Sequence, residues 1–439
     1  MYSRGEEIVT DVQNDDAGAN AIPGQRTPTA LDAVAERYVK FALAIGQHDA
    51  AYVDAYYGPP QWQHEAQRQP QDLATIRAGV DAALWLLSEQ HPTQRDEVWR
   101  AACLDKQLRS MLARLEMLGG AVLGFDEETA RLYDAVSPHH PRAYYENLVA
   151  EIAQLLPGPG TVSERVQAFR GQLAIPPDKI GAVMDAAIRA GRERTLEYIA
   201  LPPGENFVLE LVTDKPWSGY NWYKGNFQSV IQINVDLPVY IDRAVDLGCH
   251  EAYPGHHVYN VLLEQDLMRA KGWLEYSVYP LFSPQSLIAE GTANYGIELT
   301  FSEDERLAFE QQVLYPLAGL DASLAPRYAE LNRLLAKLNY ADNDVAMHYL
   351  AGDLTRAQAI EWLVNVRLYP AEKAAQRLQF YDAMRGYVIT YNLGEDMARE
   401  YIRRHSTESD PERAKAQRWA AFRELMASPR PPSALREAV

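Results

Sequence analysis

The segment Gly248–Asn260, "GCHEAYPGHHVYN", contains three histidines and a glutamate, which are the residue types of a catalytic zinc site. Such a site uses about three protein ligands and leaves one position for water. In the common HExxH motif, two histidines lie four residues apart on one helical face, and the glutamate is the general base. Here Pro254 stands four residues after His250, and the next histidines are His256 and His257. The residue types therefore fit zinc chemistry, but their spacing does not fit a regular helix.

The Pro-Gly pair between the histidines predicts a local departure from helical geometry. On a regular helix the sixth position after His250 points about 120° away, and the seventh lies roughly 10 Å further along the axis. Pro254 cannot donate a hydrogen bond to the carbonyl of His250, and Gly255 permits unusual backbone angles. A bulge of two residues would bring His256 to the place of the second ligand, and a bulge of three would bring His257. We expect His256 to be the ligand, which leaves His257 beside the metal as a donor to a developing oxyanion.

A glutamate further along the chain is the expected third ligand. Glu290 lies in "SLIAEGTANYGIEL" (residues 286–299), and the apolar residues before it favour an inward-facing side chain. An isolated helical glutamate is usually solvated, so this prediction depends on the histidines upstream. Gly291 and Ala293 are small enough for close helix packing, and Asn294, one turn on, could hold a histidine ring by a hydrogen bond.

These motifs together resemble a known family. "HEAYPGHH", with "AEGTANYG" downstream and "YKGNFQSVIQINVDLP" upstream, resembles the bacterial uncharacterised family marked by HExxPGHH, which is grouped with gluzincin zinc metallopeptidases. The resemblance extends from about Leu31 to about Arg404. It implies zinc held by His250, a second histidine and Glu290, with Glu251 as general base. The chain has Gly-Thr after Glu290, where the family commonly has a bulky aromatic residue.

In the expected chemistry, zinc lowers the pKa of bound water and polarises the scissile carbonyl, and Glu251 transfers the proton to the leaving amine. The expected substrate-binding residues are Arg385, Tyr387 and Tyr391 in "RGYVITYNLGEDMAREYI" and Tyr223 in "WSGYNWYKGN". Arginine suits bidentate binding of a carboxylate, so Arg385 is a hypothesis for recognition of a peptide C-terminus. The competing interpretations are a structural ion pair for Arg385 and simple packing for the tyrosines, of which the chain has 26.

The elements that must position these residues are mostly helical. Apolar residues recur every three or four positions from Leu31 onward, which is typical of packed amphipathic helices. Two short segments, Phe207–Val212 and Phe227–Asn234, have the composition of strands and are separated by an aromatic turn. The second of them could present its edge to an extended peptide. We therefore predict a mainly α protein with one small β-sheet next to a gluzincin-like active-site helix. Its expected regions are a disordered tail (1–30), a helical N-terminal region (31–200) and a catalytic region (201–439).

Composition limits the classes of partner. The net charge of −18 gives no basic excess for a general nucleic-acid role. Two cysteines favour a reducing compartment, and no segment is apolar enough to span a membrane, so we expect a cytoplasmic protein. The expected partner is a short or flexible peptide, or another small amide. The alternatives are a specialised C–N cleaving enzyme on a non-peptide amide, and a catalytically silent binding protein of the same fold.

Overall fold

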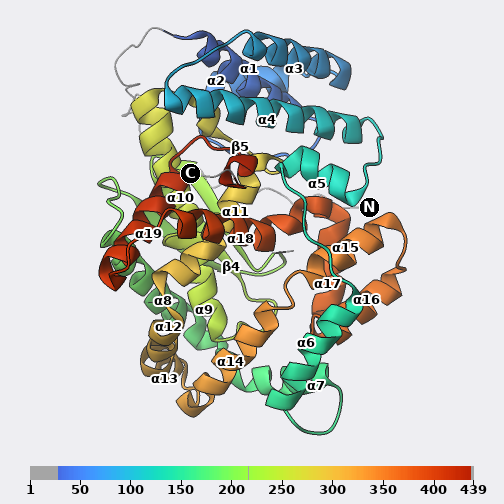
Figure 1. Cartoon of the computed structure of the whole chain (residues 1–439), viewed down its shortest axis with the longest axis vertical. Coiled ribbons are helices and arrows are strands. Elements are labelled where there is room, and N and C mark those ends of the chain that lie inside the picture. The colour runs from blue at the N-terminus through green and yellow to red at the C-terminus, as the bar shows by residue number, and fades with distance from the viewer. Residues whose placement is uncertain (1–27, 216, 437–439) are drawn as a thin grey trace.

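Helices form most of the computed structural model, which describes residues 28–215 and 217–436 (Figure 1). The mainly α class predicted from the periodicity is confirmed. The first helices are α1 Ala30–Ile45, α2 Pro60–Arg68, α3 Leu73–Ser88, α4 Arg95–Leu118, α5 Phe125–Tyr133, α6 Arg142–Leu155, α7 Val162–Arg170 and α8 Ile180–Leu196. The later helices are α9 Asp242–Leu247, α10 His256–Leu262, α11 Pro284–Thr300, α12 Glu303–Phe309, α13 Tyr315–Ala318, α14 Ala325–Ala336, α15 Ala341–Ala351, α16 Arg356–Asn365, α17 Ala371–Met384, α18 Ile389–Arg404 and α19 Pro411–Met426.

The predicted sheet is present, with one strand more than expected. Its order is β2 (Asn206–Val212), β4 (Gln228–Asn234) and β3 (Gly219–Gly225). The segment expected to be an aromatic turn is therefore strand β3, antiparallel to β4, whereas β2 pairs with β4 in parallel. Because β4 is hydrogen-bonded on both sides, the expectation that its edge receives a peptide is wrong.

A second, two-stranded ladder was not expected. Strand β1 (Val53–Tyr56) pairs antiparallel with β5 (Val278–Pro280). Strands of four and three residues give little alternating pattern, and their pairing joins positions more than 200 residues apart. The ladder connects the regions 31–200 and 201–439, and one continuous apolar core includes residues of both.

Close packing of α11 on α18 brings the C-terminal segment to the third expected ligand. A Cβ added at Gly291 would lie 2.3 Å from main-chain atoms of Gly394 on α18. No side chain fits at that approach, so the small residue after Glu290 has the packing role expected of it. The contact places Tyr387 and Tyr391 near Glu290.

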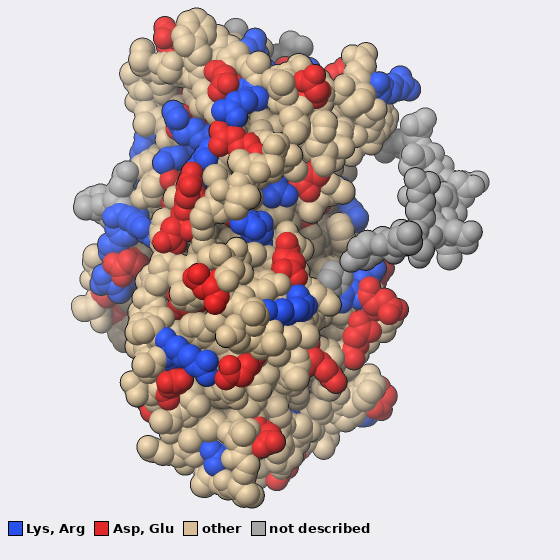
Figure 2. Space-filling view, turned by 90° about the vertical axis from the view of Figure 1, so that its right-hand side faces the viewer, with Lys and Arg blue, Asp and Glu red and all other residues tan. Residues whose placement is uncertain are grey.

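The remaining sequence expectations concern the tail and the surface. The expected tail lies outside the described residues except for 28–30, and α1 begins at Ala30. Among the described helices none is long and apolar enough to cross a membrane. On the face shown in Figure 2, acidic and basic side chains are interspersed.

Candidate metal centre

The backbone bulges between His250 and His256, as the Pro-Gly pair predicts. After α9 the chain forms a π-helical turn, Gly248–Ala252, and α10 then starts at His256. The Gly255 N–H bonds to the Cys249 carbonyl at 2.9 Å. A Cβ at Gly255 would lie only 1.9 Å from the His250 carbonyl oxygen, so no other residue fits this position. The bulge brings His256, not His257, next to His250.

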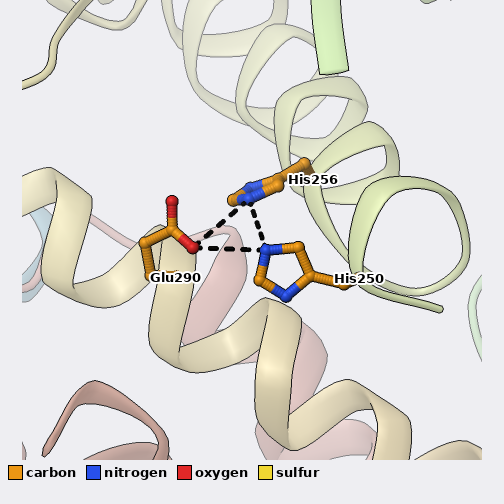
Figure 3. A group of neighbouring side chains, drawn as sticks. All are labelled: His250, His256 and Glu290. Atoms are coloured by element: carbon orange, nitrogen blue, oxygen red, sulfur yellow. Dashed lines mark hydrogen bonds and ion pairs between the residues drawn. The ribbon is translucent and has the colours of Figure 1, made fainter. Parts of the chain in front are cut away.

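Three side chains converge from two separate segments (Figure 3). One ligand atom of each of His250, His256 and Glu290 lies within 4.8 Å of the other two. The two Nε2 atoms are 3.1 Å apart, and Glu290 Oε2 is 3.2 Å from His250 Nε2 and 3.6 Å from His256 Nε2. The two histidine side chains are 13% and 14% exposed, so the group is largely but not fully buried.

The donor set and its spacing fit zinc. Tetrahedral ligands about 2.0–2.1 Å from zinc lie roughly 3.3 Å from one another, close to the three observed separations. Glu290 Oε2 is buried and, apart from its ion-pair contacts with the two imidazoles, has no hydrogen-bond partner in the described chain, so a bound cation would satisfy it when both imidazoles are neutral. Two imidazoles and a carboxylate are also a common catalytic zinc set.

Neighbouring polar groups fix the orientation of the three side chains. Asn294 Oδ1 lies 2.9 Å from His250 Nδ1, which is the contact expected for this asparagine. Its Nδ2 donates to the Tyr391 carbonyl, so Oδ1 is left as the acceptor and the His250 Nδ1 carries the proton. Tyr387 donates to Glu290 Oε1 at 2.7 Å. Both contacts leave His250 Nε2 and Glu290 Oε2 directed at the shared space.

Charge interactions within the group are strong. Burial alone would raise the pKa of Glu290, but the positive charges of His256 and His250 lower it well below its usual range. Burial alone would lower the pKa of His256, and Glu290 instead raises it to about 9. Metal binding requires both imidazoles to be neutral, so protons compete with a cation for this site.

Glu251 lies where a general base is expected. Its side chain is 5% exposed, and no group in the described chain donates a hydrogen bond to its carboxylate. Burial raises the pKa of Glu251, against the charges of His250 and His256. Strand β3 approaches so closely that a Cβ at Gly219 would lie 2.8 Å from Glu251 Oε1. Asn221 on the same strand donates to the Glu251 main-chain oxygen at 2.7 Å.

Sequence reasoning missed Asp54 in β1. Burial raises the pKa of Asp54 to about 7; of the charges that act on this carboxyl, His256 lowers the pKa, and Glu290 and Glu251 raise it. Asp54 lies at the irregularity between Val53 and Ala55 in the ladder that β1 forms with the distant strand β5, so its position leaves no local signal. The one available sign was an acidic residue among aromatic and apolar neighbours in "AYVDAYY".

His257 is not beside the three converging residues, contrary to expectation. The ring is fully buried, with Nδ1 2.8 Å from Ser229 Oγ and Nε2 3.0 Å from Glu205 Oε2. Burial alone would raise the pKa of Glu205, but hydrogen bonds from His257, Tyr253 and Arg192 lower it to about 2. Since both ring nitrogens are occupied, His257 supplies no donor to a substrate and instead ties α10 to the sheet.

Two of the expected substrate-binding residues also have structural partners. Arg385 Nε donates to the buried Glu128 at 2.7 Å, so the competing interpretation of an ion pair applies. Tyr223 donates to the buried Glu264. Tyr391 differs from both, because its hydroxyl has no hydrogen-bond partner in the described residues, and the charges of Glu290 and Glu251 both act on its pKa. Tyr391 therefore stays a candidate for substrate contact, and Tyr387 orients Glu290.

We expect Asn294→Ala to weaken zinc binding about 10- to 100-fold without unfolding the protein, because His250 loses the acceptor that fixes its tautomer. A competition titration with a chelator would measure the affinity. Asn365→Ala, at an exposed helical asparagine on α16, is the matched control. Equal affinity in both variants would contradict this orienting role.

Comparison with known proteins does not identify the chain. No family model and no curated protein matches it. Similar solved structures include "the putative lipoprotein from Colwellia psychrerythraea", with 15% identity over 93% of this chain and 77% of that chain, and a TM-score of 0.48. Another is "a putative lipoprotein of unknown function from Shewanella oneidensis", with 13% identity over 83% and 76%, and a TM-score of 0.44. A third, "BsuCP Crystal Structure", has 12% identity over 89% and 88%, and a TM-score of 0.44. All three TM-scores are below 0.5, so these similarities assign no activity.

Proposed function

We propose that this protein is a zinc-dependent metallopeptidase that hydrolyses amide bonds of short or flexible peptides. The observation that carries the proposal is the convergence of His250, His256 and Glu290 with ligand-like separations, next to the unpaired carboxylate of Glu251. The resemblance of "HEAYPGHH" to the HExxPGHH family supports the same assignment.

The residues have separate roles in this proposal. His250, His256 and Glu290 would hold zinc, which supplies Lewis acidity for the scissile carbonyl and for the attacking water. Glu251 accepts the proton of that water and returns it to the leaving amine. A carboxylate that accepts no other hydrogen bond and has a raised pKa suits both transfers.

Tyr391 replaces His257 as the proposed donor to the developing oxyanion. Burial raises its pKa well above the usual value, so its hydroxyl keeps its proton at neutral pH. The ring packs 5.8 Å from Tyr387, which itself holds Glu290. The Tyr391 ring thus packs beside a residue that contacts a proposed metal ligand, and a donor to an oxyanion must be held in place in this way.

Cytoplasmic localisation is part of the same proposal and rests on the two free cysteines, Cys103 and Cys249.

A structural zinc site has no need for the buried carboxylate of Glu251 beside it, which favours catalysis over silent binding.

The test combines metal analysis with digestion of a peptide library. We expect about one zinc per chain and zinc-dependent cleavage that is lost on chelation and restored by added zinc. Bound zinc without cleavage of any peptide would favour the silent binding protein, or an enzyme for a non-peptide amide. A protein that takes up no zinc would overturn the proposal.

A further inference from the structure

One histidine outside the metal centre lies between carboxylates of two different helices. His139 is in the segment between α5 and α6. Its Nε2 lies 2.8 Å from Asp126 Oδ1 in the first turn of α5, and its Nδ1 lies 2.8 Å from Asp344 Oδ1 on α15. A neutral imidazole has one N–H and an imidazolium has two, so the ring can donate to both carboxylates only when it is protonated. The geometry is therefore that of a protonated histidine that joins α5 to α15.

The two carboxylates differ in their access to water. The Asp344 side chain is 1% exposed, whereas that of Asp126 is 50% exposed and that of His139 is 30% exposed. Asp344 also accepts from the His140 main-chain N–H and from the Tyr145 hydroxyl. A neutral ring keeps its single proton on Nδ1, because the buried carboxylate of Asp344 cannot turn to water. Loss of a proton therefore breaks the contact with Asp126, whose carboxylate would then face the lone pair of Nε2.

Among the residues that the structure describes, no other charged group contacts the His139 ring. The other charged side chains of α5, of α15 and of the start of α6 pair elsewhere: Glu127 with Arg131, Glu128 with Arg385, Arg142 with Glu146 and Glu361, Asp342 with Arg367 and Arg377, and His348 with Asp353. Burial alone would lower the pKa of His139, but Asp344 and Asp126 raise it. The stabilisation is therefore complete below the ordinary pKa of histidine and is lost as the pH rises through the raised pKa.

Helix α5 directly supports the segment that orients a proposed metal ligand. Glu128 on α5 accepts from the Gly386 N–H at 2.9 Å. A Cβ at Gly386 would lie 2.8 Å from a side-chain methyl group of α5, so the helix leaves no room for a side chain there. The ring of Tyr133 packs edge to face 6.0 Å from that of Tyr387, which donates to Glu290 Oε1. A displacement of α5 therefore reaches Tyr387 and its contact with Glu290 through packed atoms.

We propose that His139 is a proton-controlled tether. Its protonated form holds the first turn of α5 on α15 and so keeps the support of Tyr387 in place. Its neutral form releases Asp126 and loosens that support, which sets an alkaline limit to the order of the segment Arg385–Val388. The effect on Glu290 and on zinc affinity rests on the proposed metallopeptidase function, whereas the tether itself does not.

The experiment measures hydrogen exchange of the Gly386 amide in the full chain without metal, corrected for the intrinsic exchange rate at each pH. We expect the protection of this amide to fall at least about tenfold between about pH 6 and about pH 9, because the tether is lost over that range. Asp126→Ala removes the partner of Nε2 and leaves the buried Asp344 contacts in place. Its Gly386 protection should be low already at the lower pH and should change less than about twofold. Glu127→Ala removes a charge from the same turn, at a side chain that is 57% exposed, and is the matched control.

Two further measurements separate the tether from the metal. A titration of the histidine ring resonances should place the pKa of His139 above about 6.5, the ordinary value, with the exposed His64 as an internal reference. Chelator competition gives the zinc affinities of the unmodified protein and of Asp126→Ala. Their ratio should be about three- to tenfold at the lower pH and should approach one at the higher pH, where neither protein has the tether.

Each outcome decides the inference. Equal protection of Gly386 at both pH values in the unmodified protein, or a pKa of His139 at or below the ordinary value, would overturn the tether. The same loss of protection in Glu127→Ala would attribute the effect to the charge of the helix end and would also overturn it. Changing protection in a protein that takes up no zinc would retain the tether and reject the metallopeptidase. Zinc-dependent cleavage with constant protection would do the reverse.

Discussion

Replacing Glu251 by glutamine is expected to reduce peptide hydrolysis by about 10²- to 10⁴-fold while zinc content and melting temperature stay unchanged. The amide has nearly the size of the carboxylate, but it cannot accept the proton of the attacking water. Because burial raises the pKa of Glu251, its charge is costly to the folded state, so a neutral glutamine should not destabilise the protein. The measurement is turnover at saturating substrate, together with metal analysis and thermal unfolding.

The matched control for this variant is Glu210→Gln, at an exposed glutamate of β2 that lies on the same sheet as Gly219. It should leave turnover and zinc content at the level of the unmodified protein. Near-normal turnover in Glu251→Gln would reject the general-base role. Loss of zinc in that variant would instead place Glu251 among the metal ligands.

Alanine in place of His256 should reduce the zinc content from about one per chain to nearly none, whereas alanine in place of His257 should retain the zinc. The reason is the two-residue bulge, which directs His256 toward His250 and Glu290. His257 contacts Ser229 and Glu205, so its loss removes the ring partner of the buried Ser229 hydroxyl and one of the three side-chain hydrogen bonds of Glu205. The free energy of unfolding of His257→Ala should therefore fall by about 1–3 kcal/mol.

Each of the two variants, His256→Ala and His257→Ala, is the control for the other, because the substitution is the same and the positions differ by one residue. Metal content and denaturant unfolding measured on both variants separate a ligand from a structural residue. Loss of zinc in His257→Ala with retention in His256→Ala would show that three residues, and not two, are extruded. Retention of zinc in both variants would show that neither His256 nor His257 is needed as a ligand beside His250 and Glu290, and would contradict the proposed site.

Part of this site was predictable because its causes are local. Pro254 lacks an N–H, and Gly255 has no Cβ, whatever the rest of the fold does. These two properties predict the bulge, and the structure shows the close approach that only glycine permits. The apolar period of the helices and the alternation of β4 are local properties of the same kind, and the mainly helical fold follows from them.

Other features depend on partners that are distant in the sequence. The sequence contains many acidic residues that could pair with Arg385. Its partner is Glu128 because α5 packs against the segment that follows α17. The same is true of His257, whose partners Ser229 and Glu205 come from the sheet region, and of Tyr223, which meets Glu264.

The sequence by itself determined the ligand types, the bulge and the helical class, because each follows from neighbours along the chain. The tertiary structure alone decided that the charges of His256, Glu290 and Glu251 act on Asp54, that carboxylates of two helices meet at His139 and that β3 lies against Glu251. The physical reason is that the pairing of a polar group depends on which chain segments meet in the folded core. Charge and hydrogen-bonding capacity are fixed by residue type, but the partner is fixed only by the fold.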